Sequence, residues 1–111
     1  MSRIIFAEDA WEEYLYWQAQ DKRTLKKINS LLKAIRREPF IGEGKPEPLK
    51  DSTNGEWSRR INEKDRLVYM VSREDIIVTQ CKGHYDDKKI LLRKSSSFSR
   101  NQVSKGERGI A

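Results

Sequence analysis

Three strand-like runs in the second half of the chain constrain its fold more than any other feature. They are EWSRRIN, RLVYMV and IIVTQCKG, and they begin at residues 56, 66 and 76. The connectors between them, EKD and SRED, are only three and four residues long. Connectors this short can join antiparallel neighbours but not parallel ones. The sequence therefore predicts two consecutive β-hairpins.

Two amphipathic helices are predicted before these hairpins, over residues 7–20 and 22–38. Acidic residues in the first turn of the first helix complement its dipole. Asp21 can cap the second helix, and Glu38-Pro39 ends it. The apolar faces are expected to contain Trp11, Tyr14 and Leu15 in the first helix, and Leu25, Ile28, Leu32 and Ile35 in the second.

The order of these elements predicts the fold class. RIIF near the N-terminus suits an opening strand, and the glycine- and proline-rich residues 41–55 suit a loop. The predicted order is β-α-α-β-β-β, an α+β domain with two helices packed on one face of a small antiparallel sheet. A length of 111 residues fits one such domain.

The charge of the chain is uneven. The net charge is +6, and residues 86–111 contain seven Lys or Arg against three Asp or Glu. Residues 1–85 are therefore expected to form the folded domain, and residues 86–111 a basic, largely disordered C-terminal extension. Residues 22–37, within the predicted second helix, contain seven basic residues and no acidic one. That surface can face a polyanion, or it can be an ordinary solvated helix face.

Several classes of protein are disfavoured. No run approaches the length of a membrane-spanning helix, and the N-terminus has no signal-peptide core. A single cysteine, Cys81, cannot form an internal disulfide, which suits a reducing cytoplasm, and its strand-like surroundings favour a core position. No cluster of metal ligands is evident, so neither a metal nor another cofactor is expected.

The predicted hairpins bring candidate site residues together. If the second hairpin turns near residues 73–74, Arg66 lies opposite about Cys81, and the only histidine, His84, is just beyond. Strand alternation puts Arg59 and Arg60 on opposite faces of the sheet. One of them must share the face of the site, and the sequence leaves open which. An outer-face ion pair is the favoured interpretation of Arg59.

A histidine, a glutamate and several arginines suffice for metal-independent RNA cleavage. A carboxylate can take the proton of the 2′-hydroxyl as it attacks the phosphate, and an imidazolium can protonate the leaving 5′-oxygen. Arginines stabilise the charge on the phosphate. Residue types alone are a weak signal, and on that basis a partly exposed residue at a strand end is the favoured interpretation of His84.

The ordered motifs are more specific. EDAWEEYLYWQ, QDK, KKIN, GKPEPLK, WSRRI, RLVY and GHY follow one another through residues 1–85. This series resembles the YoeB (Txe) toxins of the RelE/ParE toxin–antitoxin superfamily. The resemblance implies a compact microbial-RNase-like (RelE-like) domain. It also implies a ribosome-dependent, metal-independent endoribonuclease that cleaves mRNA in the ribosomal A site and inhibits translation.

The resemblance also implies roles and partners. Glu47 in KPEPL would be the general base, Arg66 the phosphate-stabilising arginine and His84 the general acid. Lys50, Arg60 and Tyr85 would contact and orient the substrate. The implied partners are mRNA and rRNA of the 30S A site, a cognate YefM-like antitoxin and a second copy of the chain. Operator DNA would be bound only by the toxin–antitoxin complex.

Two alternatives and one departure remain. A non-catalytic binder of the ribosome or gyrase in the same fold is disfavoured by the Glu47 and His84 pair. A DNA-binding repressor subunit is disfavoured because repression in these systems usually needs the antitoxin's DNA-binding domain. YoeB-like chains normally stop at the His-Tyr pair, whereas this one continues for 26 residues. Those residues can be inert, add contacts to rRNA or inhibit the site.

Overall fold

The computed structural model describes residues 2–83 of the chain. The predicted extension 86–111 and the predicted site residues His84 and Tyr85 lie outside the described residues. The elements are β1 (Ile4–Phe6), α1 (Glu8–Gln20), α2 (Lys22–Arg37), β2 (Glu47–Pro48), β3 (Trp57–Arg60), β4 (Arg66–Ser72) and β5 (Asp75–Gln80). The α+β class and both predicted hairpins are confirmed.

The strands form one five-stranded sheet in the order β1-β5-β4-β3-β2. Neighbours are antiparallel except β1, which pairs with β5 in parallel. The sheet is therefore mixed rather than wholly antiparallel, because the helices and the long loop carry the chain from β1 to the far side of the sheet. The predicted loop 41–55 contains the short edge strand β2. This strand stays short because Pro46 and Pro48 have no N–H to donate.

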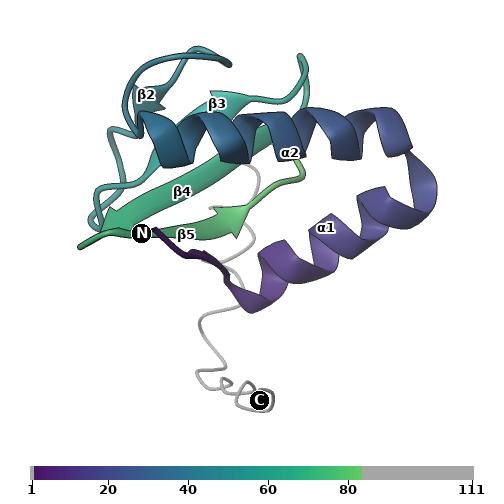
Figure 1. Cartoon of the computed structure of the whole chain (residues 1–111), viewed down its shortest axis with the longest axis horizontal. Helices are drawn as coiled ribbons and strands as arrows, with labels where there is room; N and C mark the ends of the chain where they lie inside the picture. Colours follow the sequence, from purple (N-terminus) through teal and green to yellow (C-terminus); the bar gives the residue numbers. More distant parts are fainter. Residues whose placement is uncertain (1, 84–111) are drawn as a thin grey trace.

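The two helices pack on one face of the sheet (Figure 1). In α2, the predicted apolar stripe is confirmed: Ile28, Leu32 and Ile35 are buried, and Leu31 joins them. They cover a core that includes Leu67, Tyr69, Ile76 and Val78 of the two central strands. The side chain of Asp21 accepts hydrogen bonds from the backbone N–H groups of Arg23 and Thr24, which confirms the predicted cap.

The predicted inner face of α1 is only partly right. Trp11 and Leu15 are exposed, whereas Ala10 and Trp17 are buried and Tyr14 is half-buried. The indole of Trp17 sets this rotation, because its Nε1 donates to the backbone oxygen of Cys81 (2.8 Å). Cys81 is fully buried, as predicted.

Arg59 is the clearest correction. It is fully buried on the helix-covered side of β3 instead of forming an ion pair on the outer face. Its guanidinium donates to the backbone oxygens of Glu38, Ile41 and Glu43 at 2.7–2.9 Å, and to the hydroxyl of Tyr69 at 3.1 Å. The loop that follows α2 has unpaired carbonyls, and a buried guanidinium satisfies three of them at once. We call Arg59, Tyr69 and the residues they bind in 38–43 the loop clamp.

Candidate active site

Three predicted site residues share the helix-free face of the sheet. Trp57 lies opposite Tyr69, and both pack on the helix-covered side of the sheet. Side chains alternate along a strand, so residues an odd number of positions from these two lie on the helix-free face. In this register Arg60 lies directly opposite Arg66, and Glu47 lies opposite Ser58. The face that the sequence left open is thereby settled: Arg60, not Arg59, shares the face of Glu47 and Arg66.

Arg60 and Arg66 form a positive patch on that face. Like charges directly opposite each other on paired strands repel, which favours an anion between them. Neither arginine forms an ion pair with any of residues 2–83. Arg66 Nη1 donates to the backbone oxygens of Asn62 (2.7 Å), Glu63 (3.2 Å) and Asp65 (3.2 Å). Its Nε and Nη2 donate to none of the described residues and can bind a phosphate.

Glu47 supplies a carboxylate that no other residue of 2–83 engages. Its side chain is exposed, and it makes no hydrogen bond or ion pair within the described part of the chain. A second carboxylate on this face, that of Glu56, is already engaged by the hydroxyls of Ser52 (3.1 Å) and Thr79 (2.9 Å). Of the two, only Glu47 is free to accept a proton from a substrate.

The loop that leads to Glu47 is fixed by hydrogen bonds to β3 and β4. The loop clamp holds residues 38–43, and the backbone N–H of Arg60 donates to the oxygen of Gly44 (2.7 Å). Gly44 has φ of +87°, and a Cβ there would lie 2.8 Å from Leu31 Cδ2, so only glycine fits. Lys50 is exposed two residues beyond β2, and no hydrogen bond or ion pair within residues 2–83 brings its side chain to Glu47 or the arginines.

The end of β5 lies against Arg66, as the hairpin prediction required, but the register differs. A shift between Val68 and Tyr69 moves the pairing by one residue. The backbone N–H of Arg66 therefore donates to the oxygen of Gly83 (3.0 Å), and Cys81 is not its partner. Gly83 is the residue directly before His84 in the chain. The positions of His84 and Tyr85 stay predictions.

The turn between β3 and β4 lies at the predicted end of the sheet, but its contact with the end of β5 was not predicted. The Asn62 Oδ1 atom accepts from the N–H groups of Lys64 (2.8 Å) and Asp65 (2.7 Å), which closes the turn. The Asp65 Oδ1 atom then accepts from the N–H of Gly83 (2.7 Å). An Asn followed three residues later by an Asp is a recognisable turn signal, but it gives no hint of the contact with Gly83.

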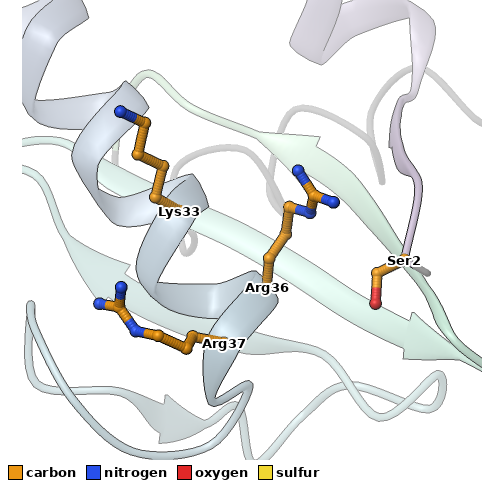
Figure 2. Close-up of a pocket in the computed structure, with 4 residues that line it drawn as sticks. All are labelled: Ser2, Lys33, Arg36 and Arg37. Carbon is orange, nitrogen blue, oxygen red and sulfur yellow. The ribbon is translucent and has the colours of Figure 1, made fainter.

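A basic surface covers the opposite side of the molecule. Lys33, Arg36 and Arg37, together called the α2 cation cluster, line a shallow pocket of about 510 Å³ with Ser2 (Figure 2). None of the three has an ion-pair partner among residues 2–83. Lys27 of the same helix does have one. Its hydrogen bond to Glu43 (2.9 Å) is the main cause that holds the pKa of that carboxyl below its usual range.

Neither a metal-binding cluster nor a membrane-spanning helix is present among the described residues. Residues 2–83 contain no group of three or more His, Cys, Asp or Glu side chains that could hold a metal ion. No helix in this range has the length and apolar character needed to cross a membrane.

The fold is that of solved toxins of the RelE-like class. The structure of a YoeB dimer from Staphylococcus aureus superposes with a TM-score of 0.71 at 49% identity, over 75% of this chain and 97% of that one. A heterotetrameric YoeB–YefM toxin–antitoxin complex from the same organism gives 0.70 at 48% identity, over 77% and 99%.

The sequence comparisons identify the family. The profile described as "YoeB-like toxin of bacterial type II toxin-antitoxin system" matches residues 6–85. Toxin YoeB of Escherichia coli K12 is 53% identical over 83 residues, which are 75% of this chain and 99% of that protein. The chain belongs to the YoeB-like toxins of bacterial type II toxin–antitoxin systems.

Proposed function

We propose that this toxin is a ribosome-dependent endoribonuclease that cleaves mRNA in the ribosomal A site and so inhibits translation. The observation that carries the proposal is the common face of Glu47, Arg60 and Arg66. The chain reaches the end of the sheet beside Arg66 at Gly83, one residue before His84. A base, phosphate-binding cations and an acid are the groups that metal-independent RNA cleavage needs.

Each group has one task in the reaction. The Glu47 carboxylate accepts the proton of the 2′-hydroxyl while the 2′-oxygen attacks the adjacent phosphorus. Arg66, with Arg60 opposite, binds the phosphate oxygens as negative charge builds on them. His84 gives a proton to the 5′-oxygen as the P–O5′ bond breaks. The products are a 2′,3′-cyclic phosphate and a 5′-hydroxyl, and Lys50 and Tyr85 contact and orient the substrate.

An exposed site explains why the ribosome is needed. Glu47 and Arg60 are both exposed on the helix-free face of the sheet, and exposed side chains by themselves hold an RNA strand poorly. The ribosome would fix the mRNA in the geometry for in-line attack. The α2 cation cluster, on the helical side of the molecule, offers a second contact, to rRNA phosphates.

The proposed protein partners are inferred from the complexes that the relatives form. The solved YoeB–YefM complex and the YoeB dimer support a YefM-like antitoxin and a homodimer for this chain. The exposed Trp11 ring, stacked on Tyr14, is a candidate dimer contact. Operator DNA would be bound by the toxin–antitoxin complex only, and the site of action would be the cytoplasm.

The test is mRNA cleavage on translating ribosomes. Wild-type protein, Glu47→Gln and His84→Gln are each added to a translating mixture, and the new mRNA ends are mapped. Asp75→Asn, a change at the opposite end of β5, serves as the control. Wild type and control are expected to cut, and both site variants to slow by at least about 100-fold. Undiminished cutting by both site variants would contradict the mechanism, and translation arrest by wild type without cutting would favour a non-catalytic binder.

A further inference from the structure

Two of the last three described residues, Cys81 and Gly83, are held by hydrogen bonds from α1, the β3–β4 turn, β4 and β5. Cys81 N–H donates to Glu13 Oε1 of α1 (2.7 Å), and Cys81 O accepts from Trp17 Nε1 (2.8 Å). Gly83 N–H donates to Asp65 Oδ1 (2.7 Å). Gly83 O accepts from the backbone N–H of Arg66 (3.0 Å) and from Gln80 Nε2 (2.8 Å). We call Asp65, Gln80 and Gly83 the Gly83 clamp.

Burial gives this clamp its strength. The exposed fractions of Asp65 and Gln80 are 5% and 2%, so water cannot readily replace either side chain. The bond from Gly83 N–H to Asp65 is charge-assisted and short. A buried carboxylate needs several donors, and Asn62 Nδ2 supplies another at 3.0 Å to Asp65 Oδ2.

The direction of the Gly83 backbone is the property that the clamp sets. Gly83 has φ of +86°, a conformation that few other residues adopt, and a Cβ there would meet nothing within 4 Å. Glycine is therefore needed for its backbone conformation and not for want of space. A flexible glycine next to a catalytic residue would allow that residue many positions, unless hydrogen bonds fix the peptide groups on both sides of the glycine.

We propose that Asp65 is a positioning residue for the reaction: through the N–H of Gly83 it holds the chain so that His84 reaches the leaving 5′-oxygen. Gln80 supports the same peptide from the other side. The inference rests on the proposed function, since it assigns His84 the role of the general acid. Asp65 itself touches no substrate.

The test separates proton donation from every other role. Cleavage is measured in single-turnover assays on ribosomes with two mRNAs, one of normal chemistry and one with sulfur in place of the 5′-oxygen at the scissile bond. A thiolate leaves without being protonated, because thiols are far more acidic than alcohols. A defect in the general acid therefore shrinks on the sulfur-containing mRNA, whereas a defect in folding, phosphate binding or the general base does not.

The variants are Asp65→Ala, Asp65→Asn, Gln80→Leu and His84→Gln, with Asp75→Ala as the matched control. The carboxylate of Asp75 binds Arg3 at the far end of β5, so its loss changes the charge equally but leaves the Gly83 clamp intact. Asp65→Ala is expected to cut the normal mRNA about 10- to 100-fold more slowly. On the sulfur-containing mRNA we expect its rate within about threefold of wild type, with ribosome affinity unchanged. Asp65→Asn keeps an oxygen for Gly83 N–H and should recover much of the rate.

The outcomes separate the acid role of His84 from the positioning role of Asp65. If His84→Gln is slowed equally on both mRNAs, or not at all, the acid role fails and this inference fails with it. If His84→Gln recovers on the sulfur-containing mRNA but Asp65→Ala does not, or if Asp65→Ala cuts normally, the proposed function stands and the positioning role is wrong. Thermal unfolding of each variant reports whether it folds. If Asp65→Ala does not fold, Gln80→Leu takes its place under the same criteria.

Discussion

Replacing Tyr69 with phenylalanine removes one buried oxygen from the loop clamp. Tyr69 and Arg59 are both fully buried. The Tyr69 hydroxyl accepts from Arg59 Nε (3.1 Å) and donates to the backbone oxygen of Pro39 (2.6 Å). In Tyr69→Phe the ring remains, so the apolar packing changes little, while both hydrogen bonds disappear.

The expected loss of stability follows from these two bonds. A hydrogen bond to a charged group contributes about 1.5–3 kcal/mol, and a neutral one about 0.5–1.5 kcal/mol. The partly buried Pro39 carbonyl can bind water in the variant, whereas the Nε of buried Arg59 cannot. We expect unfolding free energy to fall by about 2–4 kcal/mol. For a domain of this size each kcal/mol lowers the melting temperature by roughly 4–8 °C.

The same substitution should also change how stability depends on pH in the alkaline range. Burial raises the pKa of Tyr69 above its ordinary value of 10.0, although the nearby Arg59 opposes the shift. The unfolded chain therefore releases this proton at a lower pH than the folded chain does. The stability that the neutral phenol contributes is complete below pH 10 and is lost as the pH rises above it. Tyr69→Phe should lack this decline.

Urea and thermal unfolding of the two proteins measure both effects. Tyr16→Phe is the matched control, because Tyr16 is 46% exposed and its hydroxyl has no hydrogen-bond partner among residues 2–83. The control should change unfolding free energy by less than about 0.5 kcal/mol. A Tyr69→Phe protein as stable as the control would refute the view that the loop clamp is held by these polar contacts.

Three further predictions concern charge and the C-terminal residues. Changing all three residues of the α2 cation cluster to glutamine should weaken binding to ribosomes to the same extent whatever the mRNA sequence. It should also reduce the salt slope of log K by about 0.7–0.9 for each phosphate that the protein no longer binds, as read from a salt titration; an unchanged slope would remove the rRNA contact. A hydrogen bond from Arg3 lowers the pKa of Asp75, so the stability that Asp75 contributes is present at neutral pH and lost on acidification below about pH 4. Melting curves of Asp75→Asn should show no such loss, and parallel acid profiles for variant and wild type would contradict the assignment. A chain ending at Tyr85 should cleave mRNA as fast as the full chain, and faster cleavage would show that residues 86–111 inhibit the site.

The local parts of the fold were predictable because their signals are local. Connectors of three and four residues leave only hairpins for the strands they join, and the +3, +4 spacing of Ile28, Leu32 and Ile35 defines one face of a helix. The parallel pairing of β1 was not predictable. It joins Ile4 to Ile76 across most of the domain, and no short-range pattern encodes such a pairing.

The face of the site was half predictable. Alternation separates Arg59 from Arg60, but it does not say which side the helices cover. Tertiary packing decides this, because Arg59 finds three loop carbonyls under α2. The register at Arg66 was predicted wrongly because the shift between Val68 and Tyr69 has no turn-like signal in the sequence.

One hairpin, β3–β4, organises the whole candidate site. Arg60 and Arg66, opposite each other on its two strands, form the positive patch that we propose binds the phosphate. From its helix-covered side, Arg59 and Tyr69 hold the loop that leads to Glu47; from its turn, Asp65 holds the peptide that leads to His84. The proposed base and acid come from segments far apart in the sequence, yet each is tied to the same short element. Because the two clamps share no hydrogen bond, changes in one should leave the other intact, so that double variants lose stability additively.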